Sequence, residues 1–234
     1  TNISRLWDID YYLKLFQLHF ISMKALLYKV YLKFCILKSK LAQGGIAKKY
    51  ARINLCGGDI NIPGYCNIDL HPKAEMVIDL EKSTIPFKSN SVDSVVCISA
   101  INYFDRRTGQ NIINDVYRSL KKGGVARFAS QDLKVIATYY VERNTDFFYQ
   151  KSSNGADRFI GASMGDKFNS WFYGYETVSN KHCKYVYDYE TLEMMFKEAG
   201  FSVIENMAYQ ESRLEQIDII DNRPEQMFFL EAVK

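Results

Sequence analysis

Residues that bind metals or form disulfides are scarce in this sequence. It has five cysteines and three histidines in 234 residues, and no C-x-x-C pair or spaced Cys/His cluster. We therefore expect neither a zinc site, nor a disulfide framework, nor a metal-dependent reaction. Scattered cysteines favour reduced thiols and a cytoplasmic protein. They are Cys35, Cys56, Cys66, Cys97 and Cys183.

Two phosphate-binding signatures are also missing. No lysine follows the glycine pair Gly57-Gly58 in the way that a P-loop requires, and the sequence contains no G-x-G-x-x-G run. These absences exclude a P-loop nucleotide hydrolase and argue against a dinucleotide-dependent dehydrogenase.

Acidic residues are absent between Tyr11 and Gly58, a stretch that carries only positive charges. The formal net charge of the whole chain is only +3, so the remainder is net acidic. A basic segment of this kind is suited to phosphates, an anionic membrane or an acidic partner, or it is a solvated face that balances an acidic body. We expect no nucleic-acid partner, because the positive charges lie on one helix and no known nucleic-acid module accompanies them.

The basic segment has the periodicity of a long helix. Its apolar residues recur at alternating spacings of four and three, as in a heptad seam. A second apolar row lies roughly across the helix, which predicts two surfaces to pack against. One is the rest of the domain, and the other is a second copy in a homodimer, a membrane surface or a further part of the chain. The uncharged piece at 15–23 is far shorter than the about 20 residues that span a bilayer. The seam is Ile9, Leu13, Phe16, Phe20, Met23, Leu27, Val30, Phe34, Leu37 and Leu41, and the second row is Leu18, Ile21, Ala25, Tyr28, Leu32 and Cys35.

Short apolar runs that alternate with helical patterns follow this segment. We expect strands at 51–55, 66–70, 75–80, 91–99, 125–130, 201–206 and 225–233, and helices at 110–120 and 189–200. The glycine pair at 44–45 is expected to end the first helix, and the turn at 121–124 to end the helix before it. Such alternation predicts an α/β fold with a parallel sheet, finished by a hairpin. We expect residues 143–189 to form a long functional loop.

Three of these elements each place a useful group at the carboxyl end of a strand, where ligands bind in such sheets. Gly57 and Gly58 let a backbone approach a ligand closely. Asp69 offers two acceptor oxygens to a ribose diol, and Asp79 can accept from an exocyclic amine beside the apolar wall of Leu80. Together they predict an adenosine-type ligand.

At these residues the sequence resembles the class I S-adenosylmethionine-dependent methyltransferases, most closely the methyltransferase-domain group associated with bacterial surface-polysaccharide enzymes. The resemblance covers about residues 50–234 and leaves 1–49 as a basic helical extension. The stretches that carry it are INLCGGDINIPGYCNIDL, VIDLEKSTIPFKSNSVDSVV, DVYRSLKKGGVARFASQDL and YVYDYETLEMMFKEAGF.

This resemblance implies a Rossmann-like seven-stranded sheet of order 3-2-1-4-5-7-6 with the last strand antiparallel. It also implies that S-adenosylmethionine binds and that S-adenosylhomocysteine is the product. The implied cofactor contacts are Cys56, Gly57, Gly58, Asp69, Leu70, Asp79, Leu80 and Ser99.

The chain departs from the family pattern at two places. Cys56 replaces the first loop glycine of the family, so we expect a negative φ at this residue. The run SAINYF at 99–104 lacks the His and Glu that many relatives carry, so no charged group is expected to act from it.

For a hydroxyl acceptor, the protein must align the acceptor with the methyl group and remove a proton. His182 is one candidate general base. Asp132 is another, with the N-cap of a following helix as its alternative role. Tyr103 and Tyr185 are candidates for the acceptor pocket.

The resemblance predicts O-methylation of a sugar, glycan precursor or phosphorylated small molecule in bacterial capsule or surface-polysaccharide biosynthesis. We expect such an enzyme in the cytoplasm or at the inner membrane surface. The alternative is a catalytically degenerate binding or scaffold protein with the same fold, recruited through its basic helix.

Overall fold

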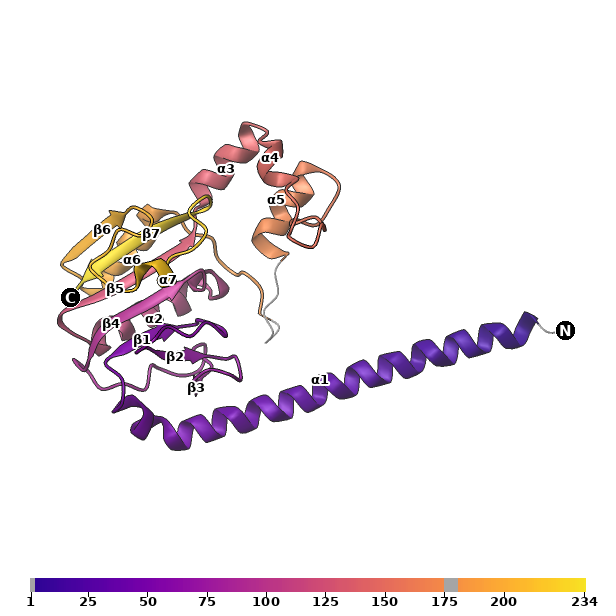
Figure 1. Cartoon of the computed structure of the whole chain (residues 1–234), viewed down its shortest axis with the longest axis horizontal. Coiled ribbons are helices and arrows are strands. Elements are labelled where there is room, and N and C mark those ends of the chain that lie inside the picture. Colours follow the sequence, from indigo (N-terminus) through magenta and orange to yellow (C-terminus); the bar gives the residue numbers. More distant parts are fainter. Residues whose placement is uncertain (1–2, 175–180) are drawn as a thin grey trace.

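A seven-stranded sheet forms the centre of the molecule, with the strand order β3-β2-β1-β4-β5-β7-β6 (Figure 1). The computed structural model describes residues 3–174 and 181–234, and side chains from residue 23 onward. The order is the one that the resemblance implied, so this prediction is confirmed. The strands are β1 (Arg52–Leu55), β2 (Cys66–Asp69), β3 (Met76–Val77), β4 (Val92–Ile98), β5 (Leu120–Gln131), β6 (Val203–Met207) and β7 (Met227–Val233).

The first five strands run parallel, and the last closes the sheet in the opposite direction. Ile53 of β1 pairs with Cys66 of β2 and with Val95 of β4. β7 is antiparallel to both β5 and β6, as predicted. The central strands are buried on both sides, which explains why their sequences are continuous apolar runs.

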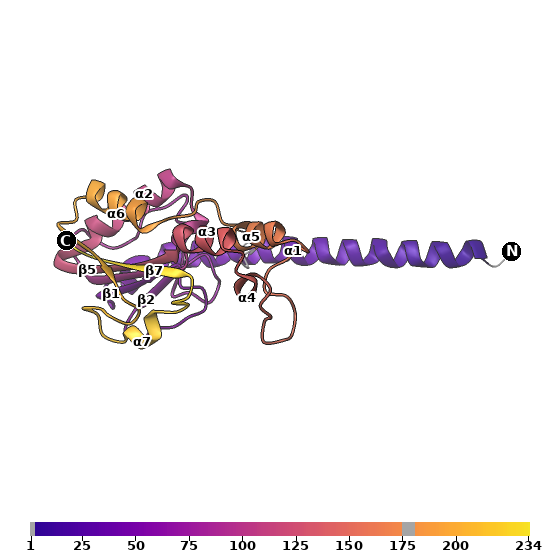
Figure 2. The ribbon, with the colours of Figure 1, turned by 90° about the horizontal axis from the view of Figure 1, so that it is seen from above.

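Helices cover one face of the sheet, and a loop with a short helix covers the other (Figure 2). On the first face lie α2 (Arg106–Ser119) and α6 (Tyr189–Ala199), which pack on the main core. On the opposite face, Ile62 and Tyr65 of the β1–β2 loop pack with Ile220 of α7 (Ile217–Ile220).

The start of β5 differs from the sequence prediction. Residues 121–124 were expected to form a turn before a strand at 125, but β5 begins at Leu120. The glycine turn stays within the strand because Gly123, at φ +78°, donates its N–H to Lys234 O at 2.8 Å. A register shift between Val92 and Ser94 in β4 accommodates it.

Beyond the end of β5 the chain forms a helical lobe (residues 133–174), where we had expected an extended loop from 143 onward (Figure 1). It contains α3 (Leu133–Val141), α4 (Thr145–Phe148) and α5 (Met164–Tyr173). α5 begins with a capping box between Ser163 and Asp166. This helix-start signal was not identified from the sequence, because the segment was characterised by its glycines and aromatic residues. The lobe has its own aromatic core of Ile136, Phe147, Phe148, Phe159, Trp171 and Phe172.

The N-terminal helix α1 (Ile3–Ala47) is a single helix that extends well past the body of the protein (Figure 1). Its C-terminal part packs on β3, where the Ser39 hydroxyl accepts a hydrogen bond from the Val77 N–H at 2.8 Å. The prediction that Gly44-Gly45 ends the helix is wrong, because α1 continues to Ala47 and its last turn is followed by a Lys49 N–H to Ile46 O bond. Among the described residues, no helix is long and apolar enough to cross a membrane.

A short 3-10 helix, η1 (Ile101–Tyr103), follows β4 after Ser99 and Ala100. η1 lies within the run SAINYF at 99–104, from which no charged group is expected to act. Its residues lead into the site described next.

Candidate active site

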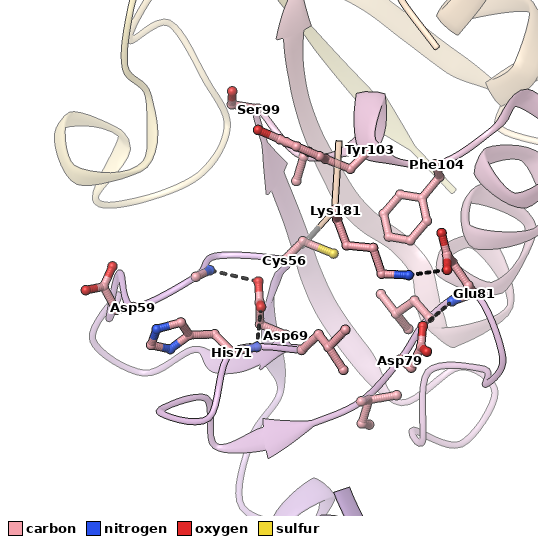
Figure 3. Close-up of a pocket in the computed structure, with 15 residues that line it drawn as sticks. Cys56, Asp59, Asp69, His71, Asp79, Glu81, Ser99, Tyr103, Phe104 and Lys181 are labelled. Carbon is pink, nitrogen blue, oxygen red and sulfur yellow. Dashed lines mark hydrogen bonds and ion pairs between the residues drawn. The ribbon is translucent and has the colours of Figure 1, made fainter. Parts of the chain in front are cut away.

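A cavity of about 320 Å³ lies at the carboxyl ends of β1, β2 and β4 (Figure 3). We call it the central cleft. This is the edge of the sheet at which the sequence predicted a ligand. It is lined by Cys56, Gly58, Asp59, Asp69, Leu70, His71, Ile78, Asp79, Leu80, Glu81, Ser99, Ala100, Tyr103, Phe104 and Lys181.

Asp69, the last residue of β2, is held by two backbone groups. Its Oδ2 accepts from the Gly58 N–H at 2.9 Å, and its Oδ1 accepts from the His71 N–H at 2.6 Å (Figure 3). Each carboxylate oxygen has a further lone pair. The carboxylate is therefore fixed in place with acceptor capacity left for a vicinal diol.

The loop after β1 contradicts one expectation. Cys56 has φ +57°, whereas we expected a negative value after its replacement of a glycine. The chain must turn sharply here because the Cys56 N–H still bonds to Ile68 O at 2.7 Å, so Cys56 keeps a left-handed conformation that glycine would adopt without strain. Burial raises the pKa of the Cys56 thiol, and Cys97 and Asp69 raise it further, so the thiol stays protonated.

The two glycines of this loop differ in what they do. Gly58 lines the cleft at φ +62°. Gly57 is not among the lining residues: a Cβ there would lie 2.1 Å from Asn54 Nδ2. Its missing side chain makes room for Asn54, which donates to Ile60 O at 3.1 Å and holds the loop.

The far end of the cleft combines an acid with an apolar wall. Asp79 accepts from the Glu81 N–H at 3.2 Å and from Lys82 Nζ at 2.7 Å. Ile78, Leu80 and Phe104 supply apolar surface beside it. A flat, apolar ring with an amine at its edge fits such surroundings.

Sequence reasoning missed a cluster of three charged side chains at this end. Glu81 accepts hydrogen bonds from Lys181 and Lys184, and Lys181 also lines the cleft. Burial opposes ionisation of Glu81, but the two lysines outweigh it and lower its pKa. About a hundred residues separate these partners in the sequence, and no local pattern signals such a contact.

Ser99 and Tyr103 connect the central cleft to a second cavity of about 490 Å³, which we call the polar cavity. Ser99 Oγ accepts from Gln131 Nε2 at 3.2 Å. Gln131 Oε1 is buried without a hydrogen-bond partner among the described residues. The polar cavity is lined by Ser99, Tyr103, Gln131, Gln150, Lys151, Ser152, Arg158, Trp171, Arg223 and Gln226.

The two candidate bases and Tyr185 line neither cavity. His182 is exposed. Asp132 caps α3 by accepting from the Lys134 N–H at 2.9 Å, and burial raises the pKa of its carboxyl. Tyr185 packs its ring edge-on against Tyr187, with 4.8 Å between centroids. In the part of the chain that the structure describes, no three His, Cys, Asp or Glu side chains form a metal-binding group.

Comparison with known proteins gives one family. Residues 45–128 match the family described as "Methyltransferase domain". A comparison with curated protein sequences finds no match.

Among solved structures, a methyltransferase of Thermotoga maritima, described as a possible histamine N-methyltransferase, has 16% identity over 88% of this chain and 92% of that chain, with a TM-score of 0.44. A methyltransferase of Archaeoglobus fulgidus has 13% identity over 85% and 93%, with a TM-score of 0.48. The phosphoethanolamine N-methyltransferase 2 of Haemonchus contortus in complex with S-adenosyl-L-methionine has 14% identity over 79% and 48%, with a TM-score of 0.43.

The matched segment runs from before β1 into β5 and contains most of the central cleft. The match therefore assigns a methyltransferase domain to residues 45–128, and the strand order is the one expected for the class I methyltransferase fold.

Proposed function

We propose that the protein transfers a methyl group to a hydroxyl of a sugar, a glycan precursor or a phosphorylated small molecule. The place we assign to this reaction is bacterial capsule or surface-polysaccharide biosynthesis, on the cytoplasmic side of the membrane. The observation that carries the proposal is the polar cavity, which adjoins the cleft at Ser99 and Tyr103 and is lined by amide and cationic side chains.

The residues of the central cleft fit the cofactor. Asp69 would accept hydrogen bonds from the ribose hydroxyls, and Asp79 would accept from the adenine amine against Leu80 and Leu70. Ser99 would lie toward the methionine end, because it borders the polar cavity. When bound, S-adenosylmethionine supplies a methyl group on a sulfonium, a donor that needs no further activation.

Gln131 is placed to orient an acceptor hydroxyl. Its Nε2 donates a hydrogen bond to Ser99 Oγ, which fixes the side chain. Its Oε1 lacks a partner among the described residues. A buried acceptor without a partner costs about 1–3 kcal/mol, so a donor supplied by the substrate is favoured here. A hydroxyl that donates to Gln131 Oε1 would stand at the junction of the two cavities, where the methyl group is expected.

The cations of the polar cavity favour an acceptor that also carries negative charge. Lys151, Arg158 and Arg223 line it, and within residues 3–174 and 181–234 no carboxylate does. Two carboxylates lie next to it: Asp157 pairs with Lys151, and Glu225 lies 3.7 Å from Arg158. Guanidinium groups bind phosphate and carboxylate oxygens in a forked geometry, which suits a sugar phosphate or a nucleotide-linked sugar.

The alternative function is a scaffold that has lost catalysis. Cys56 and the uncharged run at 99–104 favour it. The fixed carboxylate of Asp69 and the family match favour the enzyme. Failure of the folded protein to bind S-adenosylhomocysteine would favour the scaffold.

The test is release of S-adenosylhomocysteine with galactose 1-phosphate, UDP-galactose and free galactose as acceptors. We expect turnover with a charged acceptor at a kcat/KM at least about tenfold above that of free galactose, from one charge-assisted contact. Arg223→Gln should raise KM for the charged acceptor by a similar factor, and Gln131→Leu should lower kcat. Arg107→Gln, an exposed change on α2, is the matched control.

Two results would contradict this proposal. One is equal use of charged and free sugars. The other is turnover that Arg223→Gln leaves unchanged. Calorimetric binding of S-adenosylhomocysteine separates loss of the acceptor site from loss of the cofactor site.

A further inference from the structure

The proposed function leaves α1 without a role, yet this helix has two distinct faces. One face packs toward the body of the protein: Cys35 and Ser39 are buried, and Tyr28, Leu32 and Ile36 are half-buried. Tyr28, Leu32 and Cys35 belong to the second apolar row that the sequence predicted, whereas Ala25 of that row is exposed and the side chains of Leu18 and Ile21 lie outside the described residues. Figure 1 shows the body lying on one side of the helix.

The other face presents the part of the predicted heptad seam with described side chains, Met23 to Leu41, to solvent. Since successive residues turn by about 100°, these side chains lie on the side opposite Cys35 and Ser39, except that of Tyr31, which lies at the edge nearest Cys35. We call them the apolar stripe. Its members are Met23 (55% exposed), Leu26 (63%), Leu27 (62%), Val30 (58%), Tyr31 (53%), Phe34 (62%), Leu37 (56%) and Leu41 (82%). A contiguous exposed apolar surface of this kind marks an interaction site.

Lysines border the apolar stripe on both sides. On the same helical geometry, Lys24 and Lys38 flank one border, and Lys29, Lys33 and Lys40 flank the other. All five are exposed. The arrangement has an apolar centre with cationic edges, which is the pattern of helices that lie in the plane of a membrane interface.

The charges favour an anionic lipid surface over a second copy of the chain. No acidic residue lies between Tyr11 and Gly58, so two copies paired along this stretch could form no ion pair within it. In a parallel pair with this heptad, Lys33 of one helix would face Lys38 of the other, and like charges at these positions repel. Anionic headgroups would instead attract every lysine of the helix.

We infer that α1 holds the enzyme on an anionic membrane, with the apolar stripe in the headgroup region and the body on the opposite side of the helix. This goes beyond the proposed methyl transfer and does not depend on it. The apolar stripe supplies the insertion and the lysines supply the preference for negative charge.

The test is co-sedimentation of the full chain with vesicles. One set contains equal parts of phosphatidylglycerol and phosphatidylcholine, and the other contains phosphatidylcholine alone. We expect binding to the first set that weakens as sodium chloride is raised, and little binding to the second. The double variant Lys33→Gln, Lys38→Gln should lower the partition coefficient about 25-fold, at roughly fivefold per lysine.

The apolar part of the interface is tested separately. Leu27→Gln with Phe34→Gln changes two exposed residues, so folding is preserved, and it should weaken binding by at least about 100-fold. The matched control is Val141→Gln with Ile160→Gln, which removes two apolar residues of the helical lobe that are at least as exposed (79% and 69%) as Leu27 and Phe34. It should bind like the unaltered chain.

Three outcomes would overturn the inference: equal binding to both vesicle sets, absence of binding to the anionic set, or equal loss in the control variant. Light scattering at tens of micromolar adds a further arm. A stable dimer that fails to bind anionic vesicles and becomes a monomer on Leu27→Gln, Phe34→Gln would identify a second copy as the occupant of the stripe.

Discussion

Replacement of Asp69 by asparagine is the sharpest test of the central cleft. The carboxylate receives the N–H groups of Gly58 and His71, one on each oxygen. One lone pair on each oxygen remains for the two ribose hydroxyls of the cofactor. Asparagine keeps one acceptor oxygen and replaces the other with an amide NH2, so at most one of these oxygens can still serve the diol.

The expected loss follows from these contacts. A hydrogen bond to a charged acceptor contributes about 1.5–3 kcal/mol, and the variant loses one such bond and the charge behind the other. A total of about 3 kcal/mol corresponds to a Kd for S-adenosylhomocysteine that rises roughly 150-fold. In the variant, the side-chain NH2 group also points at one of these two backbone N–H groups, so a donor meets a donor. We therefore expect the free energy of unfolding to fall by about 1–3 kcal/mol.

Calorimetry with S-adenosylhomocysteine measures the first effect, and thermal unfolding measures the second. Asp93→Asn is the matched control, since this carboxylate is 52% exposed and pairs with Lys121. A folded Asp69→Asn variant that binds within about threefold of the unaltered chain, less than 1 kcal/mol, would refute the assignment of Asp69 to the ribose.

Three further predictions concern catalysis, the core and pH. His182→Gln should abolish turnover and leave the Kd for S-adenosylhomocysteine unchanged if His182 is the base, and unaltered turnover would remove it from consideration. Arg127→Met should cost about 3–5 kcal/mol in urea unfolding, because it strands Asp221, a buried carboxylate 2.5 Å from the guanidinium; a loss below about 1 kcal/mol would contradict this. Burial raises the pKa of Cys66 and Cys97 to about 12, so only the unfolded chain releases these protons above about pH 8.5. The free energy of unfolding should therefore fall between about pH 8.5 and 12, by up to ~1.4 kcal/mol per thiol per pH unit, and replacing both cysteines by alanine should flatten that slope.

The sequence was most informative where a function needs a local pattern. Asp69 and Asp79 were found because each follows a buried apolar run directly, and a parallel sheet brings such strand ends to one edge. The strand order came from the same motifs through the resemblance. α1 was found because its two apolar rows repeat over many turns. From residue 26 onward, where side chains are described, the structure buries or half-buries the second row and exposes the seam.

The rest depended on contacts between distant segments or on backbone geometry. No sequence pattern around Glu81 or around Lys181 predicts that these two residues form an ion pair. The conformation of Cys56 was wrongly predicted because the bond from its N–H to Ile68 O decides the turn, not the preference of the residue. The polar cavity combines the end of β5 with the helical lobe and with Arg223, and only the folded chain brings these together.

The hydrogen bond from the Val77 N–H to Ser39 also covers one edge of the sheet. β3 is the outermost strand on its side of the sheet and contains only Met76 and Val77. An uncovered outer strand offers unpaired backbone groups to a neighbouring molecule, which is a route to aggregation. By occupying the Val77 N–H, α1 blocks this route. A chain shortened to begin after α1 would thus expose the outer strand β3, whose backbone could then pair with a neighbouring molecule.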